Sequence, residues 1–282
     1  MTSASPAASV AALRPVRQAG APINVVQITD FHLLSDPKRT MMGLNTDESL
    51  CAVLNAVREK HWPADLLLLT GDLVQEPTPQ AYDRLKRRLE ILQPPCNCLP
   101  GNHDDPQLIR EILAQGNITF ESRILMDRWQ IICLDSTVPN DPGGYLSPQQ
   151  LELLEALLAD QPERFALICQ HHSPLPTGSR WLDTMRLSNS DELFALLDRH
   201  ASVKAVIFGH IHQALDVVRG RVRLMASPST CFQFRPNSPD FALDALPPGY
   251  RWLKLYPNGE IETGVERLAE VPTGLDITSA GY

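Results

Sequence analysis

Apolar runs of strand length alternate with helical patterns along most of the chain. Four strand-like runs span residues 23–29, 66–69, 165–169 and 203–208. Residues 66–69 are continuously apolar, as in a strand buried on both faces of a sheet. Residues 46–60, between the first two runs, have the apolar spacing of an amphipathic helix, and so do residues 82–92. The order strand, helix, strand, helix predicts an α/β fold.

The second half of the chain adds shorter strands and a further helix at residues 191–200. A strand pair and two hairpins are predicted at residues 124–126 with 130–134, at 217–225 and at 252–265. The hairpins turn at Gly220 and at Asn258-Gly259. The 24 prolines suit long ordered loops better than a helical bundle. We therefore expect two packed sheets with helices outside.

Two predicted helices carry start signals. Thr46 is expected to cap the helix at 46–60, which places Asp47 and Glu48 in its first turn, where acidic side chains are favourable. Ser147 and Gln150 have the spacing of a capping box, and Pro148 would occupy the first helical position. These signals predict where two helices begin.

Length and composition indicate one globular domain. The 282 residues, 43% of them apolar, can bury one large core, which we assign to residues 23–271. Residues 1–22 are rich in Ala, Pro and Ser and predict a flexible extension, and residues 272–282 a polar tail that either folds over the site or pairs subunits. The net charge of −8 argues against binding nucleic acid, so any phosphate site must be locally positive.

The cysteines and the amino-terminal residues indicate the cellular compartment of the protein. The six cysteines lack the spacing of a zinc ribbon or a disulfide framework, so we interpret them as buried reduced thiols. Near the amino end, Arg14 and Arg17 follow the short apolar stretch, which is the wrong order for a secretory signal. No apolar run reaches the length of a membrane span. We expect a soluble cytoplasmic protein without a membrane partner.

Metal-ligand residue types gather at the ends of the apolar strands. Five segments share this position, namely Asp30-Phe31-His32, Gly71-Asp72, Gly101-Asn102-His103-Asp104, Gln170-His171-His172 and Gly209-His210-Ile211-His212. Because ligands bind at the carboxyl ends of strands in α/β sheets, these segments should meet in one crevice. Of eight histidines only His61 and His200 lie elsewhere, at helix ends where a cation complements the dipole.

The spacing within the segments supports a shared site. Asp30 with His32, and His210 with His212, would point to one face of an extended segment. Glycines before Asp72 and two other candidates allow sharp turns and close backbone approach. A mixed oxygen and nitrogen ligand set suits iron, manganese or zinc. A single segment would be weak evidence, whereas five in order predict a metal centre.

The ordered motifs D-x-H, G-D, G-N-H-D, H and G-H-x-H resemble those of the calcineurin-like metallophosphoesterases. Nearly the whole chain beyond the extension resembles one branch of them, the bacterial cyclic AMP phosphodiesterases, or class III cyclic-nucleotide phosphodiesterases. That closer likeness rests on Ile28-Thr29-Asp30 through Leu34, Gly43-Leu44-Asn45-Thr46, Ser227-Pro228-Ser229-Thr230-Cys231 and Gly281-Tyr282. The resemblance implies a four-layer α/β/β/α sandwich of two mixed sheets and hydrolysis of 3′,5′-cyclic AMP to 5′-AMP, which would lower cyclic AMP signalling.

The resemblance also implies two metal ions, iron and/or manganese, with a bridging hydroxide as nucleophile. The first ion would be held by Asp30, His32, Asp72 and His212. The second would be held by Asp72, Asn102, His171 and His210, so that Asp72 bridges the pair. His171 is preferred to His172 because it lies nearer the strand, and His172 would then support the site from behind.

Further roles concern the substrate. His103 is the candidate acid for the leaving ribose oxygen, and Asp104 either orients it or caps the following helix. The resemblance implies that substrate phosphate oxygens lie near His32, Asp72, Asn102, His103 and His212. Phe232 and Phe234 could stack on a base, although aromatics at alternate strand positions are more often core.

Two other functions stay open. The chain could act on glycerophosphodiesters or other small phosphodiesters, for which the metal core would be similar. A metal-stabilised interaction module without turnover is the third reading, and the intact ligand positions argue against it. The sequence leaves the oligomeric state open.

Overall fold

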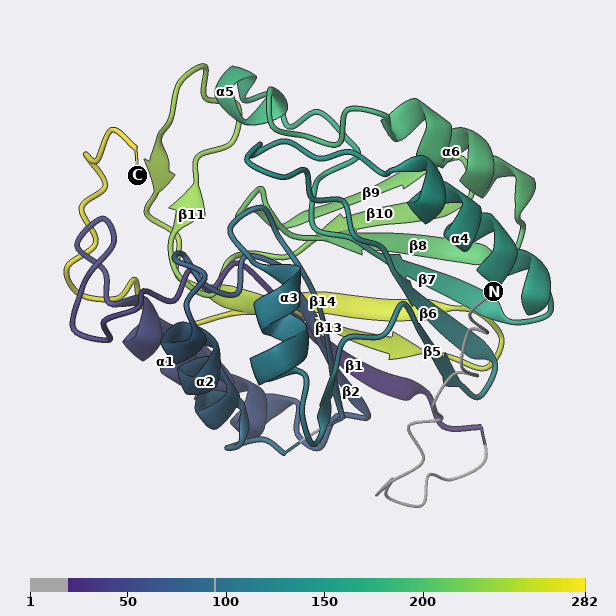
Figure 1. The fold of residues 1–282 in the computed structure, drawn as a ribbon, viewed down its shortest axis with the longest axis horizontal. Coiled ribbons are helices and arrows are strands. Elements are labelled where there is room, and N and C mark those ends of the chain that lie inside the picture. Colours follow the sequence, from purple (N-terminus) through teal and green to yellow (C-terminus); the bar gives the residue numbers. More distant parts are fainter. Residues whose placement is uncertain (1–19, 94, 282) are drawn as a thin grey trace.

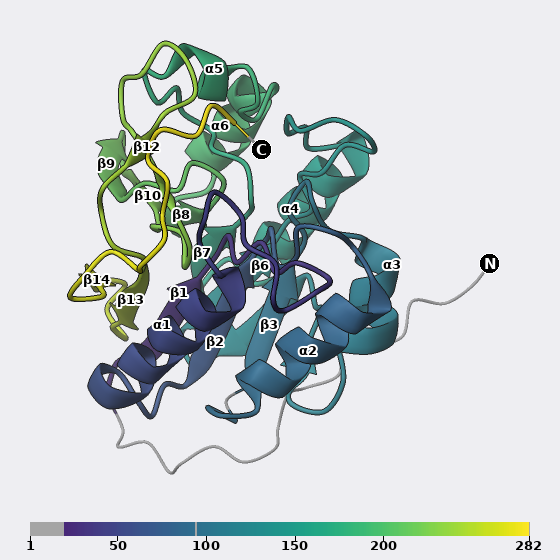
Figure 2. The same ribbon diagram turned by 90° about the vertical axis from the view of Figure 1, so that its left-hand side faces the viewer.

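Two six-stranded sheets pack face to face, and helices cover both outer faces (Figures 1 and 2). The computed structural model describes residues 20–93 and 95–281. Both sheets mix parallel and antiparallel strands. The predicted four-layer α/β/β/α sandwich is therefore confirmed.

The first sheet joins the amino-terminal strands to the carboxyl-terminal hairpin. Its order is β14 (Ile261–Arg267), β13 (Gly249–Leu255), β1 (Ile23–Ile28), β2 (Leu66–Thr70), β3 (Cys96–Leu99) and β4 (Ile118–Thr119). The strands β1 to β4 are parallel, and β13 runs antiparallel to β1. The parallel strands therefore all end at the same edge.

The second sheet is built from the middle of the chain. Its order is β5 (Arg123–Met126), β6 (Trp129–Cys133), β7 (Phe165–Cys169), β8 (Val203–Phe208), β10 (Val222–Ala226) and β9 (Leu215–Arg219). Its four central strands are parallel, and the two outer strands are antiparallel to their neighbours. A separate small ribbon pairs β11 (Gln233–Phe234) with β12 (Leu243–Asp244).

Strand β1 shows how the layers form. Val26 and Ile28 pack in a cluster with helix side chains, whereas Ile23 and Val25 pack in a cluster formed by both sheets. Successive side chains of a strand point to opposite faces, so both faces of β1 are buried. This accounts for apolar side chains on both faces of β1, where a half-exposed strand would have them on one face only.

The helices cover the sheets through apolar faces. Against the first sheet lie α1 (Thr46–Lys60) and α2 (Pro79–Leu89), and against the second lie α4 (Pro148–Asp160) and α6 (Ser190–Arg199). Shorter elements are α3 (Pro106–Leu108), the π-helical turn η1 (Ile109–Leu113) and α5 (Arg180–Asp183). Among these, only α3 was predicted, as the helix that follows Asp104. The turn η1, the helix α5 and the short strands β4, β11 and β12 were not predicted, since each is too short to show a period.

The predicted cap of α1 requires correction. Asn45, not Thr46, caps α1, because its side chain accepts the N–H groups of Asp47 and Glu48. The Thr46 hydroxyl is instead buried and donates to the carbonyl of His32. Helix α4 starts as predicted at Ser147 and Pro148.

The capping box of α4 is incomplete. The Ser147 hydroxyl accepts the Gln150 N–H, as a cap should, but the Gln150 side chain accepts from the N–H of Asp135 instead of turning back. Helix α2 begins at Pro79, earlier than the predicted residue 82, because Thr78 caps it. Both hairpins turn where predicted, at Gly220 and at Gly259.

The structure describes most of the carboxyl-terminal tail but only the last residues of the amino-terminal extension. Residues 1–19 of the predicted extension at 1–22 lie outside the described residues. In the predicted tail at 272–282, Asp276 donates its N–H to the carbonyl of Met42, and Leu275 packs on the core. Within the described chain, every helix is too short or too polar to cross a bilayer.

Replacing Asn45 by Ala should lower the free energy of unfolding by about 1 kcal/mol, since two N–H groups at the start of α1 lose their acceptor. Urea unfolding followed by circular dichroism measures this change. Asn45→Ser is the matched control, because serine caps equally well. If both variants lost the same stability, Asn45 would not act as the cap.

Candidate metal centre

All five predicted segments meet at one end of the sandwich. Three of them follow β1, β2 and β3 of the first sheet, and two follow β7 and β8 of the second. Because these strands are parallel within each sheet, their carboxyl ends share an edge. Packing the two sheets then brings the two sets of loops together, as predicted.

The backbone of these loops is left-handed at most of the predicted ligands. The residues Asp30, His32, Asp72, His210 and His212 all have φ between 46° and 68°. The prediction that the two alternating pairs lie on extended segments is therefore wrong. Their side chains converge because the loops coil tightly, a conformation that non-glycine residues rarely adopt outside functional sites.

Glycines permit the close approach of these loops. Gly71 has φ of +93°, and a Cβ there would lie 2.4 Å from Nδ1 of His171. At Gly101, a Cβ would lie 2.2 Å from the Asp72 carboxylate. Side chains at these positions would push the loops apart, as the sequence indicated.

Two buried carboxylates lie among the imidazoles. Asp72 Oδ2 is 3.3 Å from His171 Nε2 and 3.6 Å from His32 Nε2. Asp30 Oδ1 is 3.4 Å from His212 Nε2 and accepts the N–H of His210 at 3.0 Å. Both carboxylates are almost fully buried, so little solvent offsets their charge.

Hydrogen bonds fix which ring nitrogen faces the centre. His171 Nδ1 lies 2.8 Å from the carbonyl of Thr70, and His212 Nδ1 lies 2.9 Å from that of Phe232. A backbone carbonyl only accepts, so both Nδ1 atoms carry the proton. His32 Nδ1 lies 2.7 Å from the Gln75 amide oxygen, which orients it in the same way. In all three rings, Nε2 is the nitrogen that faces the carboxylates, where a bound cation would meet its lone pair.

These acceptors are too close to one another without a cation. His32 Nε2 and His212 Nε2 lie 3.1 Å apart, although neither carries the proton when Nδ1 does. The buried atoms that make no hydrogen bond within the described residues include three from the predicted ligands, namely Asn102 Oδ1, His171 Nε2 and His210 Nε2. Such atoms cost free energy unless something positive binds them. The donor set of imidazole, carboxylate and amide oxygen fits a transition-metal pair.

The pKa values agree with a cation-binding site. Burial lowers the pKa of His32 to about 3 and that of His210 well below its usual value, so both rings are neutral, as metal ligands must be. Burial also disfavours the charged form of His171, but the attraction of Asp72 and Asp30 outweighs it and raises the pKa of that ring to about 9. The carboxylates thus favour positive charge at this position.

His171 and His172 have different surroundings. Both rings are fully buried, but His172 Nδ1 bonds the Ser136 hydroxyl at 2.8 Å and its Nε2 lies 3.2 Å from the carbonyl of Pro142. Both of its nitrogens are thus already engaged. Nε2 of His171 faces Asp72 and makes no hydrogen bond within the described residues, so it is open to a cation, and the choice of His171 over His172 as ligand stays a prediction.

Asp104 holds the loop that carries Asn102. Its carboxylate accepts the N–H groups of Leu73, Val74 and Gly101 and the hydroxyl of Tyr82. The predicted cap is wrong at this residue, since Asp105 caps α3. The bonds of Asp104 tie the loops after β2 and β3 together, which is a positioning role.

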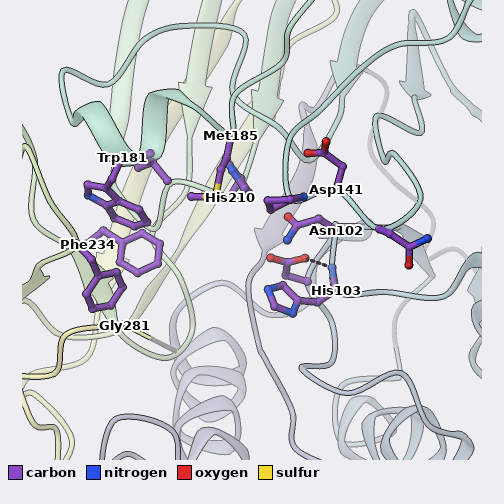
Figure 3. Close-up of a pocket in the computed structure, with 13 residues that line it drawn as sticks. Asn102, His103, Asp141, Trp181, Met185, His210, Phe234 and Gly281 are labelled. Atoms are coloured by element: carbon purple, nitrogen blue, oxygen red, sulfur yellow. Dashed lines mark hydrogen bonds between the residues drawn. The ribbon is translucent and has the colours of Figure 1, made fainter.

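A cavity of about 490 Å³ opens beside the centre. Asp72, Asn102, His103 and His210 line one end, and the backbone N–H of His103 donates to Asp72 Oδ1 at 3.0 Å (Figure 3). The His103 side chain is half-buried, so it is accessible from the cavity. Of the five predicted substrate contacts, His32 and His212 lie outside this lining and are fully buried.

Sequence reasoning missed several residues near the site. Gln75 orients His32, and Trp181 and Phe241 line the cavity, yet each stands in a segment without a periodic pattern. Phe232 is fully buried core, as the more common interpretation had it, whereas Phe234 both packs in the core and lines the cavity. Only the tertiary structure brings these side chains to the centre.

Comparisons with known proteins agree with this geometry. A family model described as calcineurin-like phosphoesterase matches residues 23–214. The chain is 42% identical, over 92% of its length and 95% of the relative, to the 3′,5′-cyclic adenosine monophosphate phosphodiesterase of Escherichia coli K12. It is also 42% identical to a 3′,5′-cyclic-nucleotide phosphodiesterase of Nostoc, over 91% and 95%. A crystal structure of a dimetal phosphatase from Danio rerio has a similar fold, with a TM-score of 0.59 and 17% identity, covering 86% of this chain and 98% of that one.

Asp104→Asn should lower the free energy of unfolding of the metal-free protein by about 1–3 kcal/mol, because an NH₂ group then faces backbone N–H donors. Urea unfolding in a chelating buffer gives the value. The neighbouring Asp105→Asn is the control and should change stability by only a few tenths, since asparagine caps as well as aspartate. Equal losses in the two variants would contradict the positioning role of Asp104.

Proposed function

The chain belongs to the calcineurin-like phosphoesterase family, and we propose that it hydrolyses 3′,5′-cyclic AMP to 5′-AMP. The observation that carries the chemistry is the crowding of acceptor atoms at the ends of five strands, which calls for bound cations. The substrate follows from the relatives, which are named cyclic AMP phosphodiesterases and align over nearly the whole chain. The cavity also has a volume suited to a small ligand.

We assign the ligands of two metal ions, iron and/or manganese, as two overlapping sets. The first set is Asp30, His32, Asp72 and His212, and the second is Asp72, Asn102, His171 and His210. Asp72 belongs to both because its Oδ2 faces His32 and His171. Two such ions supply Lewis acidity and an activated water for attack on phosphorus. The neutral amide of Asn102 leaves the site with more positive charge than a carboxylate would.

His103 is the proposed general acid. Hydrolysis of the cyclic diester expels a ribose hydroxyl, whose high pKa makes proton donation valuable. The ring of His103 lies 5.0 Å from the His32 ring, and its backbone is bonded to Asp72, so it stands beside the metal ligands without being needed as one. Asp72, Asn102 and His103 would contact the phosphate from the cavity wall, with His32 and His212 behind them.

A cytoplasmic location is part of the proposal. All six cysteines lie in the described residues and are free thiols, and five of them are buried. Free thiols are maintained in reducing compartments.

His103→Ala should retain both metals and slow hydrolysis of cyclic AMP by about 10²- to 10⁴-fold, the usual contribution of a general acid. Asn102→Ala and His210→Ala should instead lose metal from the second position together with activity. Metal content per chain by elemental analysis, and initial rates on the same samples, separate the two outcomes. Loss of metal from His103→Ala would assign His103 to the ligands.

Product analysis tests the substrate. The purified protein, loaded with manganese or iron, is incubated with cyclic AMP, cyclic GMP and a glycerophosphodiester, and the products are separated by chromatography. We expect 5′-AMP to form from cyclic AMP, and its formation to stop when a chelator removes the metals. Faster hydrolysis of the glycerophosphodiester than of cyclic AMP would overturn the proposed substrate and leave the metal chemistry intact.

A further inference from the structure

The cavity beside the metal centre has two chemically different ends. One end carries the polar residues Asp72, Asn102, His103 and His210, with Asp141 on the same side, and Asn140 and Pro142 complete the lining. The other end carries only uncharged residues, namely Trp181, Leu182, Met185, Phe234, Phe241 and Gly281. Figure 3 shows Trp181 and Phe234 across the pocket from Asn102 and His103. A ligand that fills the cavity must therefore join a charged group to an apolar one.

Three aromatic rings form the apolar end. The ring centroids of Trp181 lie 4.9 Å from Phe234 and 5.1 Å from Phe241, and the two Phe rings lie 5.6 Å apart, all at edge-on angles. Such contacts fix the rings relative to one another. Phe234 is 2% exposed and serves as the buried base of the cluster, whereas Trp181 and Phe241 are only half-buried. The latter two leave surface for a ligand.

The aromatic cluster is continuous with the metal centre. Phe234 stacks on the ring of His212 with a centroid distance of 4.2 Å and an angle of 19°. His212 Nε2 in turn faces Asp30. The apolar end therefore begins one ring away from a proposed metal ligand. In a cyclic nucleotide, one ribose ring likewise separates the phosphate, which would lie at the metal centre, from the base, which would lie at the apolar end.

The carboxyl-terminal tail also contributes to the lining of the cavity. Figure 2 shows the tail running from β14 past β12 toward α5. Asp276 bonds the carbonyl of Met42, Leu275 packs on the core, and Gly281 reaches the lining of the cavity. The described tail residues therefore reach the cavity, and both predicted roles for the tail stay predictions.

We propose that Trp181 and Phe241 form a base subsite, in which the purine of the nucleotide stacks while its phosphate lies at the metal centre. The inference rests on the proposed function and adds what that function leaves open, namely how the base is held. Apolar and aromatic contacts recognise the flat face of a base, so recognition here depends on the ring system. A diester without a base would gain no binding affinity from this end of the cavity.

Binding measurements test the subsite without relying on turnover. Calorimetry with the manganese-loaded protein compares 5′-AMP, ribose 5-phosphate and inorganic phosphate. In the unaltered protein, 5′-AMP should bind about 10- to 100-fold more tightly than ribose 5-phosphate, the range expected for one stacked base. Trp181→Ala should remove most of that difference and leave the Kd for phosphate within about 2-fold. Trp181→Phe, which keeps a ring, should retain most of it.

Phe241→Ala provides a second variant in case the loss of Trp181 prevents folding, which circular dichroism and metal content reveal. It should weaken 5′-AMP in the same selective way. The subsite is refuted if 5′-AMP binds no better than ribose 5-phosphate, or if the variants weaken 5′-AMP and phosphate equally. The proposed function fails separately, when the unaltered protein binds 5′-AMP selectively but does not hydrolyse cyclic AMP.

Discussion

Electrostatic repulsion among buried acceptors is the constraint on which the site depends. Two carboxylates and several imidazole lone pairs face one another where water is largely excluded, and His32 Nε2 and His212 Nε2 approach to 3.1 Å. In a medium of low dielectric constant such crowding is unfavourable unless positive charge balances it. The fold supplies the geometry, and bound cations would supply the charge. The overall acidity of the chain is no obstacle, because the decisive field is local.

The packing of the two sheets holds these crowded groups close together. Each left-handed residue in the loops costs roughly 1–2 kcal/mol relative to ordinary backbone. The packing of strands such as β1 and β7, whose side chains are buried on both faces, offsets this strain. Glycines at two loop starts and the four hydrogen bonds of Asp104 then fix how closely the loops approach. The stability of the packed sheets thus compensates for the strained backbone of the loops at their edge.

The sequence predicted the fold and the convergence of the ligands better than the detail around them. Continuous apolar strands and the ligand types after them are local signals, so Asp72 and His210 could be recognised from their neighbours alone. The αL backbone of Asp30 could not, because loops from both sheets impose it. Asn45 was passed over since Thr46 is also a good cap, and only the tertiary bond of Thr46 to His32 separates them. Trp181 joins the cavity through contacts with residues more than fifty positions away.

The pairing of β1 has a consequence for the order of assembly during synthesis. This strand lies between β2 and β13, and its residue Ile23 pairs with Leu255, near the other end of the chain. While the chain is still emerging from the ribosome, β1 therefore lacks one of its two neighbours. The loop with Asp30 and His32 is then held by the β2 side of the sheet alone, and the final hairpin completes its support only after every proposed ligand has been translated.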